Sequence, residues 1–355
     1  MTDAVERPWG PVVLRLQAAT RAEASWFADH YALSAPAPWP RRETLPMRTI
    51  VDADAVLDLS RRPAGAAAQR IRDEHYHVLD DGACWVRAAD RPADASVAAL
   101  PPHAIRRTEH GWDVVTDGSP LGDRLSEILA RMLLLDTLTR AGGTVLHASA
   151  AVVGGSATVF VGAGEAGKTT LALHAARVDG EFVSGDQTVL LPGAERLVVG
   201  AGLMPRLRWG TLRGLGLDDT VLRASLRRHD GARRPLSGIE PRPVKVTLTQ
   251  AELTTVLGVR TTDAGVLDRL VFVERRPGAD LLVAPLDARE VPAELTVQVL
   301  RPLAGWRPPG GDASPAEPLA RIAAETPAFR VRWDPAVHPA ATVLDRLAAA
   351  AVGSC

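Results

Sequence analysis

The sequence predicts an α/β fold, in which short apolar strands and helices surround one glycine-rich loop. Residues 157–161 are β-rich and apolar, as in a buried strand, and residues 170–177 have helical character. Hydrophobic residues make up 46% of the 355 positions, which is ample for a sizeable core. A chain of this length fits one large or two medium domains. We expect a small N-terminal α+β module over residues 1–115 and a larger α/β domain over residues 116–355.

The loop between this strand and this helix matches G-x-x-x-x-G-K-[ST], the phosphate-binding loop. In that motif backbone N–H groups cradle phosphates, the lysine reaches the β/γ-phosphates, and the Thr hydroxyl coordinates Mg²⁺. The chain has only two lysines, Lys168 and Lys245, so a compact ammonium is kept where the loop needs one. The alternative is a glycine-rich turn that merely joins strand to helix.

The predicted nucleotide contacts are the loop and the residue after it: Gly162, Ala163, Gly164, Glu165, Ala166, Gly167, Lys168, Thr169 and Thr170. Glu165 is the one acidic member of this set. Its side chain is expected to point away from the phosphates, because like charges repel.

The N-terminal residues contain fewer clear signals. Residues 11–16 and 112–115 are candidate strands, and residues 21–31 have helical character. Two β-rich runs flank Asp80-Asp81-Gly82, which predicts a hairpin. His75 and His77 would share one face of that hairpin and could hold a metal. Because no further Cys or His follows at ligand spacing, a structural role is favoured.

The rest of the chain alternates between helical and strand patterns. Ser119-Pro120 and Gly142-Gly143 would begin and end a helix, and Gly154-Gly155 would turn a hairpin into the strand before the loop. A strand, an acidic tip and a second strand are predicted over residues 181–191. Further predictions are loops at 201–243 and 306–318, strands at 267–274 and 328–333, and helices at 291–300 and 339–352.

Composition excludes several classes of function. The net charge of −1 gives no electrostatic reason to expect nucleic acid or an anionic membrane as partner. Two cysteines cannot make a disulfide scaffold and suggest a reducing compartment. No signal peptide and no apolar run of about 18 residues is evident. We therefore expect a cytoplasmic protein.

Two side chains outside the loop are candidates for chemistry. Asp186 lies 18 residues after Lys168 at the end of a β-rich run, where phosphoryl transfer needs a metal ligand or a base. A turn aspartate is the alternative. His147 lies at a strand end one hairpin ahead of the loop, and a satisfied core histidine is its alternative.

These residues together resemble the catalytic core of the HPr kinase/phosphorylase family. The resemblance rests on His147-Ala148-Ser149-Ala150, a hairpin, the loop, and Phe182-Val183-Ser184-Gly185-Asp186, and it spans about residues 120–335. Stretches at 204–208, 270–275 and 327–333 are similar to those of HPr-kinase-related proteins found near peptide-modifying gene clusters. The resemblance implies a mixed sheet with an atypical phosphate loop, shared with PEP carboxykinase.

The resemblance also implies roles for particular residues. Lys168 would stabilise the β/γ-phosphates, Thr169 and Asp186 would hold Mg²⁺, and His147 would be the active-site histidine. The chain departs from the family at Gly185, where the family has the first of two aspartates, the one credited with taking the hydroxyl proton. Either Asp186 serves as both ligand and base, or another group is the base, or transfer is impaired.

A second departure surrounds Arg213. Residues 212–217 are similar to the Arg-Gly-Leu-Gly signature of the bifunctional enzymes, but the acidic residue ahead of the Arg is missing. Arg213 is a candidate to contact phosphate or substrate. The alternative is a surface arginine in a glycine-rich loop. Phosphorylase activity is not expected.

The expected function is transfer of the γ-phosphoryl group of ATP, with Mg²⁺, to a Ser or Thr hydroxyl of a peptide or small protein. A ribosomal peptide precursor, bound in part by residues 1–115, is one such acceptor. A small-molecule kinase and a nucleotide-binding regulator with little catalysis are the alternatives. Family members of this kind often form homo-oligomers, although nothing in these residues shows an interface.

Overall fold

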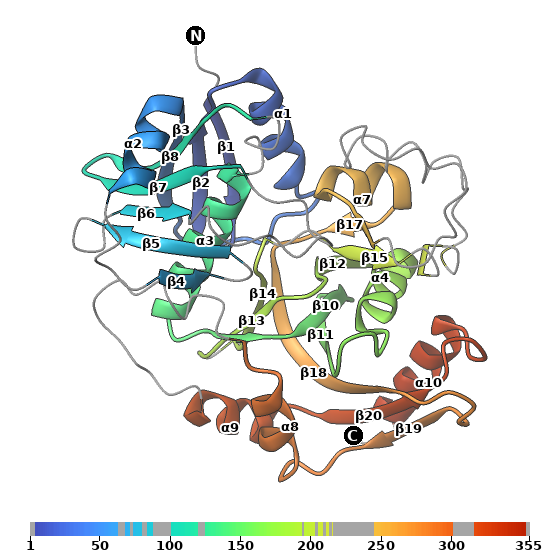
Figure 1. Ribbon diagram of the computed structural model, residues 1–355. Coiled ribbons are helices and arrows are strands. Elements are labelled where there is room, and N and C mark those ends of the chain that lie inside the picture. The colour runs from blue at the N-terminus through green and yellow to red at the C-terminus, as the bar shows by residue number, and fades with distance from the viewer. Residues whose placement is uncertain are drawn as a thin grey trace. The chain divides into compact units, whose positions relative to one another are not determined.

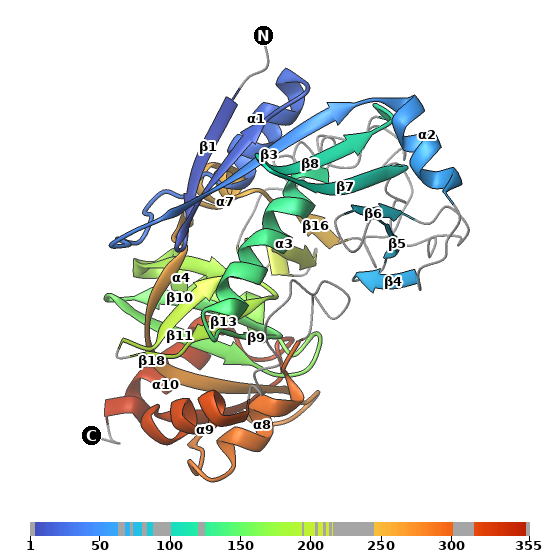
Figure 2. The ribbon, with the colours of Figure 1, turned by 90° about the vertical axis from the view of Figure 1, so that its left-hand side faces the viewer.

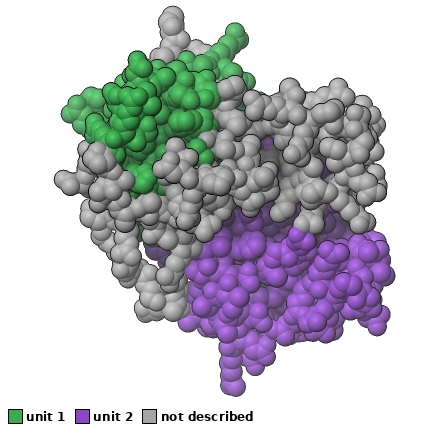
Figure 3. All heavy atoms as spheres, viewed as in Figure 1, with its two compact units in different colours: residues 1–31, 39–140, 301–312 green, residues 32–38, 141–300, 313–355 purple. Residues whose placement is uncertain are grey.

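The computed structural model describes residues 4–62, 68–71, 74–79, 84–87, 101–119, 125–193, 195–202, 205–208, 211–212, 215, 245–300 and 316–352. The chain divides into two compact units (Figure 3). Unit 1 comprises residues 1–31, 39–140 and 301–312, and unit 2 comprises residues 32–38, 141–300 and 313–355. Both contain a mixed sheet flanked by helices, so the α/β class is confirmed. The domain boundary expected after residue 115 stays a prediction; the division by contacts falls after Arg140.

Unit 1 is built on an eight-stranded sheet, which Figure 2 shows from β1 across to β4. The spatial order is β1-β2-β3-β8-β7-β6-β5-β4, and β3 runs parallel to both of its neighbours. The strands are β1 (Ala4–Trp9), β2 (Val12–Gln17), β3 (Glu43–Val51), β4 (Ala68–Ile71), β5 (Glu74–Leu79), β6 (Cys84–Arg87), β7 (His103–Thr108) and β8 (Gly111–Thr116).

Among the described residues of unit 1 there are three helices, α1 (Arg21–His30), α2 (Ala53–Arg61) and α3 (Leu125–Arg140). Successive side chains of β3 point to opposite faces of the sheet, as the two-residue period of a strand requires. Thr49 hydrogen-bonds Glu23 of α1, whereas Ile50 packs into the cluster that contains Val56 and Leu59 of α2. Helices therefore cover both faces.

Unit 2 contains a ten-stranded sheet, through which the long strand β18 (Ala264–Arg275) runs in Figure 1. Strand β11 (Ser156–Val161) lies between β10 (Ala148–Val153), which is antiparallel to it, and β18, which is parallel. Beyond these lie β12 (Gly180–Ser184) on the β10 side and β20 (Ala328–Trp333) on the β18 side. The other strands of this sheet are β9 (Thr144–Leu146), β13 (Thr188–Leu191), β14 (Leu197–Gly200), β17 (Arg260–Thr261) and β19 (Leu282–Pro285).

Two separate cores lie in unit 2, one on each face of the sheet. One holds residues of α4 (Lys168–Asp179), α7 (Gln250–Leu257) and α10 (Ala340–Val352), and the other holds residues of α8 (Val291–Val297) and α9 (Ala316–Glu325). A two-stranded sheet of β15 (Arg206–Arg208) and β16 (Lys245–Thr247) also belongs to this unit. Apolar side chains of β11 reach both cores, because Phe160 belongs to the first and Val159 to the second.

Most elements predicted from the sequence are present. The hairpins of β5 with β6 and of β10 with β11 are confirmed by their antiparallel pairing. The predicted strand, tip and strand over residues 181–191 correspond to β12 and β13. The start predicted for α3 at Ser119-Pro120 and most of the loops predicted at 201–243 and 306–318 lie outside the described residues. None of the described helices has the length and apolar character that crossing a bilayer requires.

Candidate active site

One edge of the unit 2 sheet collects the predicted site residues. Strands β11, β12, β18 and β20 are mutually parallel, so their carboxyl ends meet at that edge, and β10 begins there because it is antiparallel. The loop follows β11, Asp186 follows β12, and His147 immediately precedes β10. In open α/β sheets ligands bind at the carboxyl ends of the strands. The topology thus brings together residues that lie up to about forty positions apart.

Two glycines give the loop its shape. Gly162 has φ 150°, and a Cβ there would lie 2.3 Å from the backbone oxygen of Val273 in β18. Gly167, at the start of α4, has φ 99°, and a Cβ there would lie 2.4 Å from the Trp333 ring. The indole N–H of Trp333 donates to the Ala166 carbonyl at 2.9 Å. A side chain at either glycine would push the loop off the strands that support it.

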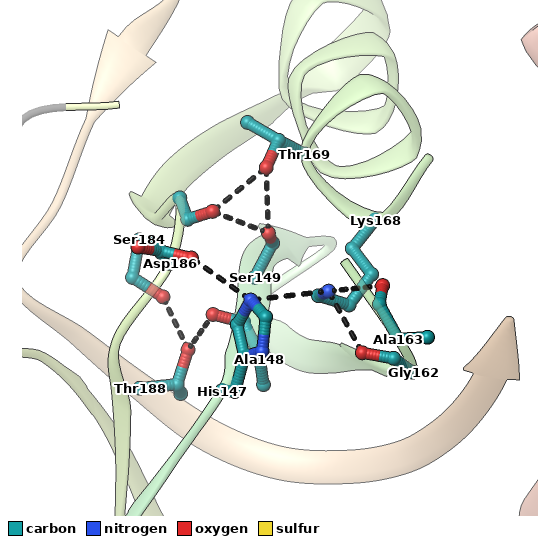
Figure 4. A network of polar contacts seen from close by, with 11 residues as sticks. His147, Ala148, Ser149, Gly162, Ala163, Lys168, Thr169, Ser184, Asp186 and Thr188 are labelled. Atoms are coloured by element: carbon teal, nitrogen blue, oxygen red, sulfur yellow. Dashed lines mark hydrogen bonds and ion pairs between the residues drawn. The ribbon is translucent and has the colours of Figure 1, made fainter. Parts of the chain in front are cut away.

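Lys168 lies buried beneath the loop, with 5% of its surface exposed. Its ammonium donates to the carbonyls of Gly162 at 2.8 Å and Ala163 at 2.9 Å (Figure 4). The same nitrogen lies 3.4 Å from Nε2 of His147. The lysine therefore places a positive charge between the loop and the histidine.

Three oxygen atoms cluster at the first turn of α4. The Thr169 hydroxyl donates to the Gly185 carbonyl at 2.7 Å, and the Ser149 hydroxyl donates to the same carbonyl at 2.8 Å. The two hydroxyl oxygens are 3.0 Å apart (Figure 4). A hydroxyl binds a cation through a lone pair, so its hydrogen must point elsewhere. The Gly185 carbonyl accepts the hydrogen bond from Thr169. A second hydrogen bond, from Ser149, holds the same carbonyl in place.

His147 and Asp186 lie in contact, with Nε2 of the imidazole 3.0 Å from Oδ1 of the carboxylate. A carboxylate only accepts, so Nε2 carries the hydrogen in this contact, and the Lys168 ammonium cannot donate a hydrogen bond to the same nitrogen. Both side chains remain partly exposed, His147 at 30% and Asp186 at 46%. Below them Thr188 donates to the Ala148 carbonyl at 2.9 Å, which ties β13 to the beginning of β10. The histidine is thus oriented from two strands.

Gly185 cannot be exchanged for an aspartate without a local rearrangement. A Cβ on Gly185 would lie 2.9 Å from Cβ and 3.0 Å from Cα of Pro205, and 3.4 Å from the Phe182 ring. Both neighbours are buried. Packing at this position therefore matches a glycine, and Asp186 is the carboxylate that the tip presents.

The donor set fits Mg²⁺. Magnesium takes oxygen ligands and keeps several waters, so it needs few protein groups. The Thr169 hydroxyl and the Asp186 carboxylate are such ligands, and both are partly exposed. Within the described residues no group of three or more His, Cys, Asp or Glu side chains gathers. The side chain of His75 lies outside the described residues, so the favoured structural role of His75 and His77 stays a prediction.

The other predicted residues have mixed outcomes. Thr170 lies next to Thr211, with the two hydroxyls 3.2 Å apart. Glu165 is exposed and has φ 66°, a left-handed conformation that is uncommon for a residue with a side chain. Arg213 lies outside the described residues, so its expected contact with phosphate or substrate stays a prediction.

Sequence reasoning assigned no role to Ser149 or to Trp333. Ser149 stands within the quoted His147–Ala150 motif, two positions after the histidine on the strand, so the two-residue period of a strand could have drawn attention to it. Trp333 lies far along the chain from the loop it contacts, and no local sequence pattern predicts that contact. The chain matches no protein-family model and no curated protein.

Proposed function

We propose that unit 2 is an ATP-dependent kinase of the HPr kinase type, which transfers a γ-phosphoryl group to a Ser or Thr hydroxyl of a peptide or small protein. The observation that carries the proposal is the contact of His147 with Asp186, beside Lys168 of a phosphate-binding loop. Phosphoryl transfer needs little covalent chemistry from the protein. It depends mainly on positioning and on charge stabilisation, which this group of residues can supply.

Each residue has a role that follows from its contacts. The loop N–H groups and Lys168 would hold the β- and γ-phosphates. Asp186 would accept the proton of the acceptor hydroxyl, which then attacks the γ-phosphorus as the bond to the β-phosphate oxygen breaks. His147 donates a hydrogen bond to Asp186 and so orients the carboxylate. Thr169 and Asp186 would hold Mg²⁺, which neutralises charge on the phosphate oxygens when bound.

Transfer of label from [γ-³²P]ATP tests the proposal, with Mg²⁺ and peptides encoded beside the gene as acceptors. We expect phosphoserine or phosphothreonine in at least one peptide, and no transfer by Lys168→Ala. Absence of label in every peptide, together with tight Mg·ATP binding, would contradict a peptide kinase. Label in a metabolite pool instead would identify a small-molecule kinase.

A nucleotide-binding regulator with little catalysis is the second candidate, and the packing of Pro205 against Gly185 favours it. Pro205 leaves no room at position 185 for the aspartate that would act as base. Asp186 would therefore have to be both metal ligand and base. Under this alternative Asp186→Asn would leave nucleotide affinity and turnover equally unchanged. A kinase would lose turnover selectively.

A further inference from the structure

Ser149 lies within the candidate active site, yet the kinase reaction described above gives it no role. The residue is fully buried on β10, with none of its surface exposed. Its hydroxyl contacts two other elements, the first turn of α4 through Thr169 and the tip after β12 through Gly185 (Figure 4). One side chain therefore joins the two segments that carry the proposed Mg²⁺ ligands, Thr169 and Asp186.

Strand pairing stops just before the tip, and Ser149 provides a hydrogen bond at that point. The ladder between β10 and β12 ends at the pair of Ala150 with Ser184. Gly185 is the next residue along the chain, and its carbonyl accepts from Ser149 at 2.8 Å and from Thr169 at 2.7 Å. Side-chain hydroxyls thus hold the tip where the backbone ladder no longer does.

The hydrogens of the two hydroxyls determine what Ser149 can do when a cation is bound. A cation uses a lone pair of the Thr169 oxygen, so the Thr169 hydrogen points to the Gly185 carbonyl. A carbonyl oxygen has two lone pairs, so it accepts the Ser149 hydrogen as well. In this arrangement Ser149 holds the carbonyl and leaves the lone pair of Thr169 to the cation.

Magnesium binding depends strongly on where its ligands lie. Mg²⁺ requires near-ideal octahedral geometry, with ligand oxygens about 2.0–2.1 Å away. Asp186 directly follows Gly185, so a shift of the Gly185 carbonyl also shifts the Asp186 carboxylate. Replacing a residue that orients metal ligands without touching the metal typically costs about 10–100-fold in metal affinity or activity.

We propose that Ser149 is a positioning residue, which holds Thr169 and Asp186 at the spacing that Mg²⁺ requires. This proposal rests on the proposed function, because it assumes that the loop binds a nucleotide together with Mg²⁺. It goes beyond that function by assigning part of the affinity for the cation to a side chain that does not bind the cation itself.

Calorimetric titration with ADP, once with Mg²⁺ and once with EDTA, tests the proposal without requiring catalysis. The ratio of the two dissociation constants measures how much the cation adds to nucleotide binding. We expect wild-type protein to bind Mg·ADP at least about tenfold more tightly than ADP in EDTA. Ser149→Ala should weaken the binding of Mg·ADP by about tenfold and leave that of ADP in EDTA within about twofold of wild type.

Ser184→Ala is the matched control, because Ser184 is also a buried serine beside the tip. Its hydroxyl contacts Thr188 at 2.5 Å rather than Gly185 or Thr169, so the ratio should stay unchanged. Equal weakening of ADP with and without Mg²⁺ in Ser149→Ala would show a general effect on the loop and overturn the proposal. An unchanged affinity for Mg·ADP in Ser149→Ala, or an equal loss in Ser184→Ala, would also overturn it. Wild-type protein that binds neither form, or binds both equally, would instead contradict the proposed function.

Discussion

Asp186 is the one carboxylate that the tip after β12 presents, and the proposed mechanism gives it two tasks. Replacing Asp186 by Asn removes the base and a metal ligand while keeping the shape. We expect kcat to fall by about 10²–10⁴, the usual range for loss of a general base. Single-turnover transfer from labelled ATP measures this fall, and calorimetry should show that ATP still binds.

His147→Gln provides the comparison, because it acts on the same carboxylate indirectly. Loss of an orienting partner typically costs about 10–100-fold, so its effect on kcat should be smaller than that of Asp186→Asn. If His147→Gln were as damaging as Asp186→Asn, the histidine rather than the aspartate would be the base. The pH profile of kcat would then follow the histidine.

Gly185→Asp should not create a better kinase. The new Cβ would lie within 3.0 Å of Pro205, and overpacking of this kind costs about 1–3 kcal/mol. We expect a lower midpoint in urea unfolding and no gain in kcat. Combining it with Pro205→Gly removes the Pro205 Cβ and should recover part of the stability. A fully stable single variant with raised kcat would contradict this account of the packing.

Strand β20 supports the phosphate-binding loop through Trp333. Trp333→Phe keeps an aromatic ring against Gly167 but loses the hydrogen bond to the Ala166 carbonyl. A net loss of about 1 kcal/mol corresponds to roughly fivefold weaker binding of Mg·ATP. Calorimetry measures the change. Trp112→Phe on β8, in unit 1, is the control and should leave the affinity unaltered.

Elements with an uninterrupted local pattern could be predicted from the sequence. Strand β18 contains an uninterrupted apolar run over residues 270–273, and the glycine pair after β10 marks the hairpin of β10 with β11. The spacing of the loop motif likewise identifies Lys168 and Thr169. In these cases the local residues alone specify the conformation.

Strand β3 shows why other elements were missed. Pro46 lies within it, and a proline argues against a central strand because it lacks an N–H. The pairing of β3 with β8 begins only at Met47, so Pro46 has a ladder partner on β2 and none on β8. A proline is thus tolerated in β3 because of how β3 pairs with distant segments of the chain. That pairing cannot be predicted from the local sequence. Helix α7 is different, since its capping box of Thr249 and Glu252 is a local signal from which its start could have been predicted.

The two units allow ligand binding and pH to be followed in separate parts of the chain. Mg·ATP should stabilise unit 2 by about 2.7 kcal/mol at a concentration one hundred times its Kd. Hydrogen exchange at amides of α4 and β11 measures this protection. Lys168→Ala should abolish the protection, and a protection that survived this variant would place the nucleotide elsewhere.

Unit 1 contains a buried histidine that should make its stability depend on pH. Burial lowers the pKa of His103 from 6.5 to about 4, against a hydrogen bond to Pro101 that raises it. Between about pH 4 and pH 6.5, His103 is therefore protonated in the unfolded chain and neutral in the folded unit. Stability is present above about pH 6.5 and is lost as the pH falls toward 4. Between pH 7 and pH 5 the loss should be roughly 2 kcal/mol.

Labelling of the Cys84 thiol measures this loss, because Cys84 is buried in unit 1 with 1% of its surface exposed. A Cys355→Ser background restricts labelling to that site. His103→Gln, which keeps a partner for the Tyr76 hydroxyl, should flatten the pH dependence of the labelling rate. An equally steep dependence in this variant would assign the effect to another group.

The contact between Gly185 and Pro205 also constrains how this chain could change over generations. Placing an uncrowded aspartate beside Asp186 takes two substitutions, one at Gly185 and one at Pro205, and their order matters. Changing Gly185 first passes through a crowded intermediate, whereas changing Pro205 first opens the space that the new side chain needs. The effect of one substitution depends on the other, which is epistasis between neighbouring residues. A library that varies position 185 alone would therefore miss the route that a paired library can find.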